Sequence, residues 1–106
     1  MAFAMGTPLL DACVLAVLSG GDAYGYSLTQ RVKERLDISE STLYPVLRRL
    51  ERDGYLRVYD WPFQGRNRRY YAITQVGRTY LDVRRGEWKE FRDGVDALLE
   101  EESEHG

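Results

Sequence analysis

The segment Leu9–Leu18 is apolar on almost every side, and it constrains the fold more than any other feature of the sequence. Only Asp11 interrupts it, and a helix with this pattern is buried on most of its faces. The segment has about half the length of a bilayer span and no basic stretch before it, so we expect neither a membrane helix nor a signal peptide. We therefore expect a largely buried helix from Pro8 to Ser19, capped by Thr7.

Length and composition indicate a single compact domain of 106 residues. The lone cysteine, Cys13, cannot form an internal disulfide, and with the lone histidine, His105, it cannot build a tetrahedral metal site. We therefore expect a protein of a reducing cytoplasm that holds no metal or other cofactor. Met1 and Met5 are both candidate start residues.

Periodicity predicts two more helices after the first. One covers residues 24–36, with an apolar side chain at every fourth position. The next begins at a cap, Ser39 or Ser41, and ends at Gly54. Its buried stripe has helical spacing and consists of Leu43, Val46, Leu47 and Leu50.

Two strand-like runs follow, residues 55–61 and 68–73, and a last helix is expected from a Thr74 cap to about Glu102. Pro62, Gly65 and Asn67 predict a hairpin loop too long for a two-residue turn. The fold class expected is mainly α with a small β-hairpin, a winged helix-turn-helix with a long C-terminal dimerisation helix. Residues 1–73 would form the DNA-binding domain, and residues 74–106 the dimerisation helix and acidic tail.

The charge is unevenly distributed, although the net charge is only −2. From Asp96 onward there are five acidic and no basic residues, whereas residues 1–95 carry 15 basic and 12 acidic side chains, a net +3. Residues 41–70 hold seven arginines against three acids, a net +4. Because salt screens charges beyond roughly 8–10 Å, this local surplus matters more to a nucleic acid than the total does.

The face of the third helix opposite its leucine stripe presents hydroxyl and guanidinium groups, on Ser41, Tyr44, Arg48 and Arg52. Such groups suit phosphate oxygens and base edges in a major groove. The alternative is an ordinary solvated face in which Arg48, Arg49 and Arg52 pair with Glu51.

A basic hairpin loop follows within twenty residues and carries Arg66, Arg68 and Arg69. Arginines on a narrow projection suit a minor groove, where negative potential concentrates. A hairpin kept soluble by charge is the alternative. Taken together, the helix and the hairpin favour double-stranded DNA as the partner.

The last helix has two rows of side chains spaced by seven residues: Leu81, Trp88 and Val95, and Arg84, Phe91 and Leu98. Such rows predict a homodimer interface formed by the apolar members, with Arg84 as the polar exception. The alternative, which remains open, is that this face packs against the first helix of its own chain. A two-fold dimer would place two recognition helices about one DNA turn apart on a pseudo-palindromic site.

Trp88 also suggests an effector site. An indole at the seam of a dimer can line a cleft for a small planar aromatic compound. The alternative is that Trp88 only anchors the interface.

Three ordered motifs resemble the PadR family of bacterial transcriptional regulators over about residues 9–99. They are Ser41–Glu51 followed by Asp53–Leu56, then Tyr24–Leu28, and finally Gly65–Tyr71 with Thr74–Gly77. The resemblance implies a winged-helix repressor, in the short subfamily, that is often released by small molecules. It assigns recognition-helix roles to Thr42, Tyr44 and Arg48, and wing roles to Arg66, Arg68 and Arg69. Ser41 and Asn67 depart from the glycine and proline common in the family.

Two other classes compete with a regulator. An enzyme fits poorly, because the sequence offers no nucleophile with a base, no paired carboxylates and no glycine-rich phosphate loop after a strand. A winged-helix adaptor that binds only proteins is the stronger rival, but an adaptor has no need for an arginine-rich wing.

Overall fold

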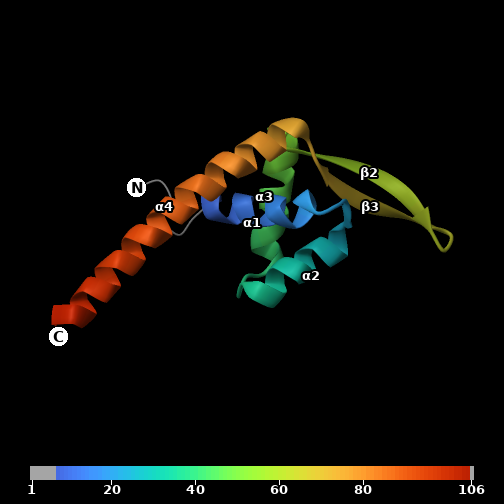
Figure 1. Cartoon of the computed structure of the whole chain (residues 1–106). Coiled ribbons are helices and arrows are strands. Elements are labelled where there is room, and N and C mark those ends of the chain that lie inside the picture. The colour runs from blue at the N-terminus through green and yellow to red at the C-terminus, as the bar shows by residue number, and fades with distance from the viewer. Residues whose placement is uncertain (1–6, 106) are drawn as a thin grey trace.

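The computed structural model describes residues 7–105, with side chains for residues 8–101. Met1, Met5, the Thr7 cap and the side chains of Glu102 and Glu104 lie outside this description. The elements, in chain order, are α1 (Thr7–Ser19), β1 (Ala23–Tyr24), α2 (Gly25–Arg35), α3 (Glu40–Arg52), β2 (Leu56–Phe63), β3 (Arg66–Ile73) and α4 (Gln75–His105) (Figure 1). The mainly helical fold with a hairpin and a long last helix is confirmed. Within the described residues, no helix is both long and apolar enough to cross a membrane.

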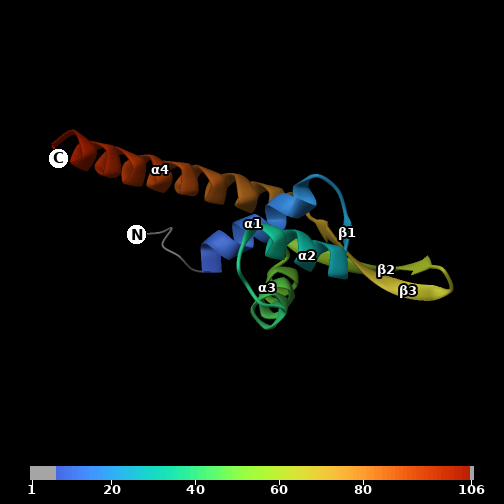
Figure 2. The same ribbon diagram turned by 90° about the horizontal axis from the view of Figure 1, so that it is seen from below.

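Helix α1 lies at the centre of the core, as its apolar pattern predicts. Val14, Leu15 and Leu18 are completely buried, and α1 packs against α2, α3 and α4. Two perpendicular views show α1 between α4 and the pair α2–α3 (Figures 1 and 2). The side chains that enclose it come from each of these helices: Leu28 and Val32, then Leu43, Leu47 and Leu50, and finally Leu81.

Helix α3 begins at a serine cap and exposes one face along its length. Ser39 is the cap, and its hydroxyl accepts a hydrogen bond from the Thr42 backbone N–H at 3.3 Å. The expected leucine stripe is buried, and Pro45 lies early enough in the helix to be tolerated. Asp53 is the C-cap, and Gly54 follows with φ of +86°, a left-handed conformation that favours glycine.

The hairpin is part of a three-stranded antiparallel sheet in the order β1-β3-β2. The helix expected from about Tyr24 begins one residue later, because Ala23 and Tyr24 pair with Tyr71 and Tyr70. A two-residue strand leaves no periodic signal, and its partner lies more than forty residues away. Helix α2 consequently begins at Gly25.

The expected long hairpin loop is wrong. Phe63 pairs with Arg66, which leaves a two-residue turn of Gln64 and Gly65, with φ of 52° and 80°. Two positive φ values match the right-handed twist of the flanking strands. Pro62 pairs with Asn67 inside the ladder, where an edge strand tolerates proline.

A buried carboxylate joins three helices. Asp11 of α1 accepts hydrogen bonds from both terminal nitrogens of Arg49 on α3 and, at 3.0 Å, from the Tyr80 hydroxyl on α4. The bond to Asp11 raises the pKa of Arg49. Burial, and then the bond to Asp11, raise the pKa of Tyr80 to about 12. The position of α3 is thereby tied to that of the long helix.

Candidate nucleic-acid interface

The exposed face of α3 carries the side chains that the sequence singled out. Ser41, Tyr44 and Arg48 are all exposed, opposite the buried stripe. The Ser41 hydroxyl lies 2.9 Å from the hydroxyl of the cap residue Ser39, and the Thr42 hydroxyl lies 3.1 Å from it. The start of α3 is therefore a cluster of hydroxyl groups that can donate to phosphate oxygens.

Helix α3 and the hairpin meet at a shared hollow of about 430 Å³. Tyr44 and Arg48 line it from α3, and Arg69 and Tyr71 line it from β3. Residues 24–26, at the junction of β1 and α2, close its third side. The structure thus brings one recognition-helix arginine and one wing arginine to the same surface.

The other two wing arginines lie on the opposite face of the hairpin, because side chains alternate along a strand. The Arg68 guanidinium lies 4.3 Å from the Tyr24 ring centroid and 3.8 Å from that of Phe63. Arg66 and Arg68 line a second hollow of about 330 Å³, also bordered by Tyr24. Tyr24 therefore joins the two hollows, and the three wing arginines surround the projecting hairpin rather than cluster on one side of it.

These arginines are not neutralised by the protein's own acids. Within the described side chains, no carboxylate lies in salt-bridge range of Arg48, Arg66, Arg68 or Arg69. The interpretation of α3 as an ordinary solvated arginine face does not hold for Arg49, which binds the buried Asp11.

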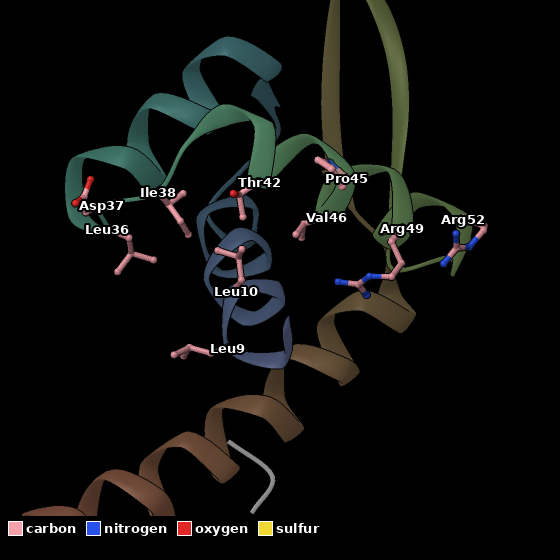
Figure 3. Close-up of a pocket in the computed structure, with 10 residues that line it drawn as sticks. All are labelled: Leu9, Leu10, Leu36, Asp37, Ile38, Thr42, Pro45, Val46, Arg49 and Arg52. Atoms are coloured by element: carbon pink, nitrogen blue, oxygen red, sulfur yellow. The ribbon is translucent and has the colours of Figure 1, made fainter. Parts of the chain in front are cut away.

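Arg52 and Thr42 line another hollow, on a different side of α3. Both line a larger, mainly apolar hollow of about 830 Å³ between α3, the start of α1 and the turn after α2 (Figure 3). Arg52 also lies 3.4 Å from the Asp53 carboxylate. The structure therefore does not group these two residues with Arg48 and Arg69.

Aromatic side chains on the outer face of β2 were missed. Trp61 is 61% exposed and Phe63 is 41% exposed, and the Tyr59 and Tyr70 rings stack 5.6 Å apart on the same face. The aromatic side chain at every second position in residues 59–63 is the signal that places Tyr59, Trp61 and Phe63 together.

The expected interface residues on α4 divide into an inner and an outer group. Leu81 is 2% exposed and belongs to the core of its own chain, so the fold-back alternative holds for this residue. Trp88 and Phe91 pack partly against the same core, with ring centroids 6.0 Å apart. Val95 and Leu98 are exposed on the part of α4 that extends beyond the other elements, with 67% of Leu98 accessible (Figure 1).

Three helices, a hairpin wing and a long C-terminal helix define a winged helix-turn-helix protein. The family model of the PadR-like transcriptional regulators matches residues 14–83. The chain belongs to this family of transcriptional regulators.

Individual relatives agree with this assignment. Uncharacterized protein X of Lysinibacillus sphaericus is 34% identical over 96 residues, which cover 86% of this chain and 88% of that protein. The crystal structure of smu.1704 from Streptococcus mutans UA159 is similar with a TM-score of 0.84 and 38% identity, over 94% of both chains. A PadR family transcription regulator of Clostridium difficile R20291 has a TM-score of 0.78 and 28% identity, over 85% of this chain and 97% of that one.

Proposed function

We propose that this protein is a sequence-specific repressor that binds double-stranded DNA as a homodimer. The observation that carries the proposal is the hollow shared by Arg48 of α3 and Arg69 of the hairpin. A helix that enters a major groove beside a wing over the adjacent minor groove needs both cations on one surface. No carboxylate among the described side chains lies within salt-bridge distance of Arg48 or Arg69, which supports their availability to phosphates.

We expect Arg48→Ala to weaken specific binding by about 1–3 kcal/mol and to relax the base preference at one position. Arg66→Ala should weaken binding to all sequences alike and reduce the slope of log affinity against log salt by about 1. Binding sites are first selected from random DNA. The affinity of each variant for these sites is then measured by fluorescence anisotropy at two salt concentrations. Arg85→Ala is the matched control, because this exposed arginine lies on α4.

Equal affinity of the wild type, Arg48→Ala and Arg66→Ala for DNA would contradict the proposal. A wild-type protein that selects no DNA sequence at all would favour the adaptor instead.

The homodimer is proposed to form along α4, with the division at residues 73 and 74 separating the DNA-binding domain from the dimerisation helix. Val95, Leu98 and Leu99 are exposed together near the end of α4, and a contiguous exposed apolar patch of this kind supports an interface there. Phe91, Val95 and Leu98 would lie in this interface, with Trp88 beside them.

Sedimentation at micromolar concentration should give about twice the chain mass of 12.3 kDa. Leu98→Asp should raise the dimer dissociation constant by about tenfold or more, because it places a charge at the seam. Val83→Asp is the control, since Val83 is exposed and belongs to neither of the two seven-residue rows. A wild type that sediments as a monomer would rule out the dimer.

A small planar aromatic effector is proposed to bind beside Trp88 at this seam. In a Trp61→Phe background, which leaves Trp88 as the single tryptophan, such a compound should quench the fluorescence and release DNA. If a broad panel of planar aromatic compounds changes neither signal, Trp88 acts only as an interface anchor.

A further inference from the structure

One face of the three-stranded sheet carries aromatic rings that the hollow beside α3 does not use. By strand alternation and pairing, this aromatic face consists of Tyr24, Tyr59, Trp61, Phe63 and Tyr70. Trp61 is 61% exposed and Phe63 is 41% exposed. The hairpin that bears them projects beyond the helices in both views (Figures 1 and 2). Large rings gathered on an uncovered surface indicate a binding site.

The rings form a row across and along the sheet. The Tyr70 ring is nearly parallel to that of Tyr59, with centroids 5.6 Å apart, and lies 5.9 Å from that of Tyr24. Trp61 and Phe63 continue the row along β2, about 7 Å apart as alternate residues of a strand. Successive bases of a single nucleic-acid strand can each stack on one such ring, whatever the base, because every base has a flat π-face.

The aromatic face also carries guanidinium groups, on Arg57, Arg66 and Arg68. Arg68 lies over the rings of Tyr24 and Phe63, and Arg57 lies 5.4 Å from the Tyr59 ring centroid. Stacking uses the flat side of a guanidinium group, so the N–H donors in its plane remain directed outward. No carboxylate among the described side chains lies within salt-bridge distance of these three arginines. They are therefore suited to phosphates.

The charge of this face also favours a polyanion. Asp22 is the one carboxylate among the residues that line its two hollows, of about 330 and 390 Å³. It accepts a hydrogen bond from the Tyr59 hydroxyl at 2.7 Å, and so it holds that ring in place. Three arginines thus outnumber a carboxylate that already has a partner. A duplex covers the flat sides of its bases by stacking, whereas an unpaired strand can offer them to the rings.

We infer that the aromatic face is a second nucleic-acid site, which binds single-stranded DNA. Bases stack on Trp61 and Phe63, and phosphates bind Arg57 and Arg68. Tyr24 borders both this face and the hollow shared by Arg48 and Arg69, so an unpaired stretch of the same DNA can reach it. The choice of DNA over RNA rests on the proposed function; the stacking site does not.

Trp61→Ala should weaken the binding of a labelled oligothymidine of about 12 nucleotides by about tenfold, measured by fluorescence anisotropy. Trp61→Phe should stay within about threefold of the wild type, because a phenyl ring still stacks. The matched control is Tyr26→Ala, which should leave this affinity unchanged. Tyr26 is 59% exposed, and it lines the hollow beside α3 instead.

Arg57→Ala tests the phosphate contact. It should reduce the slope of log affinity against log salt for oligothymidine by about 0.7, the value for one phosphate of a single strand. The control Arg85→Ala, on α4, should keep the wild-type slope.

The same variants separate this site from duplex binding. Trp61→Ala should keep the affinity for a selected duplex, and Arg48→Ala should keep the affinity for oligothymidine, each within about twofold. A wild type that binds no oligothymidine at about 100 μM protein overturns the inference, whatever its affinity for duplex. An equal loss of both affinities in Trp61→Ala also overturns it, because the face then belongs to the duplex surface. Oligouridine bound about tenfold more tightly than oligothymidine overturns the choice of DNA. Binding of oligothymidine without any binding of duplex supports this site and contradicts the proposed function.

Discussion

Gly77→Ala should lower the free energy of unfolding by about 3 kcal/mol or more. A β-carbon at Gly77 would lie 2.0 Å from the backbone oxygen of Tyr55 and 2.9 Å from a side-chain carbon of Ile73. Backbone atoms cannot move aside as the end of a flexible side chain can. The obstruction lies where β3 enters α4, so the junction between the wing and the long helix must separate to admit a single methyl group.

Urea unfolding at fixed protein concentration measures this effect, since dimerisation makes stability depend on concentration. The control is Gly86→Ala in the same helix, where a β-carbon meets nothing within 4 Å. Alanine there should stabilise the protein by as much as about 1 kcal/mol, through helix propensity alone. Similar urea midpoints for Gly77→Ala and the wild type would contradict this prediction, because they would show that the backbone at the junction accommodates the methyl group without loss of stability.

Arg49→Met should cost about 3–5 kcal/mol, because it removes the cation that compensates a buried charge. Asp11 is 1% exposed, and without Arg49 its carboxylate keeps only the Tyr80 hydroxyl among the partners described. The double variant Asp11→Leu and Arg49→Met should recover most of the loss, since a buried ion pair and an apolar pair of similar volume have comparable stability.

The same unfolding assay compares the single and the double variant. If Arg49→Met lowers the free energy of unfolding by less than about 1 kcal/mol, water reaches Asp11 once Arg49 is gone.

Local periodicity was sufficient to predict most of the elements and part of the site. The leucine stripe of α3 has a strong helical repeat, so its buried face, and with it the exposed face of Arg48, followed from spacing alone. The serine cap and Gly54 set the ends of that helix by backbone chemistry that acts within a few residues. The central place of α1 followed because an all-apolar helix must be covered.

The errors arose where the deciding partner is distant in the sequence. Tyr24 was assigned to a helix because its pairing with Tyr70 leaves no local pattern. The hairpin loop was predicted too long because Pro62 and Asn67 are common in loops, whereas cross-strand pairing keeps both in the ladder. The two faces of the hairpin, which separate Arg69 from Arg66 and Arg68, depend on that same register.

By itself the sequence determined the order of helices and hairpin, the buried faces and the presence of a basic segment, because these depend on neighbours within one or two turns. Only the tertiary structure decided which cations are available. Arg48 and Arg49 are adjacent in sequence, yet Arg48 lines the hollow beside the wing and Arg49 binds the buried Asp11. A guanidinium group responds to whichever charge lies within a few ångströms, and packing of distant segments sets that charge.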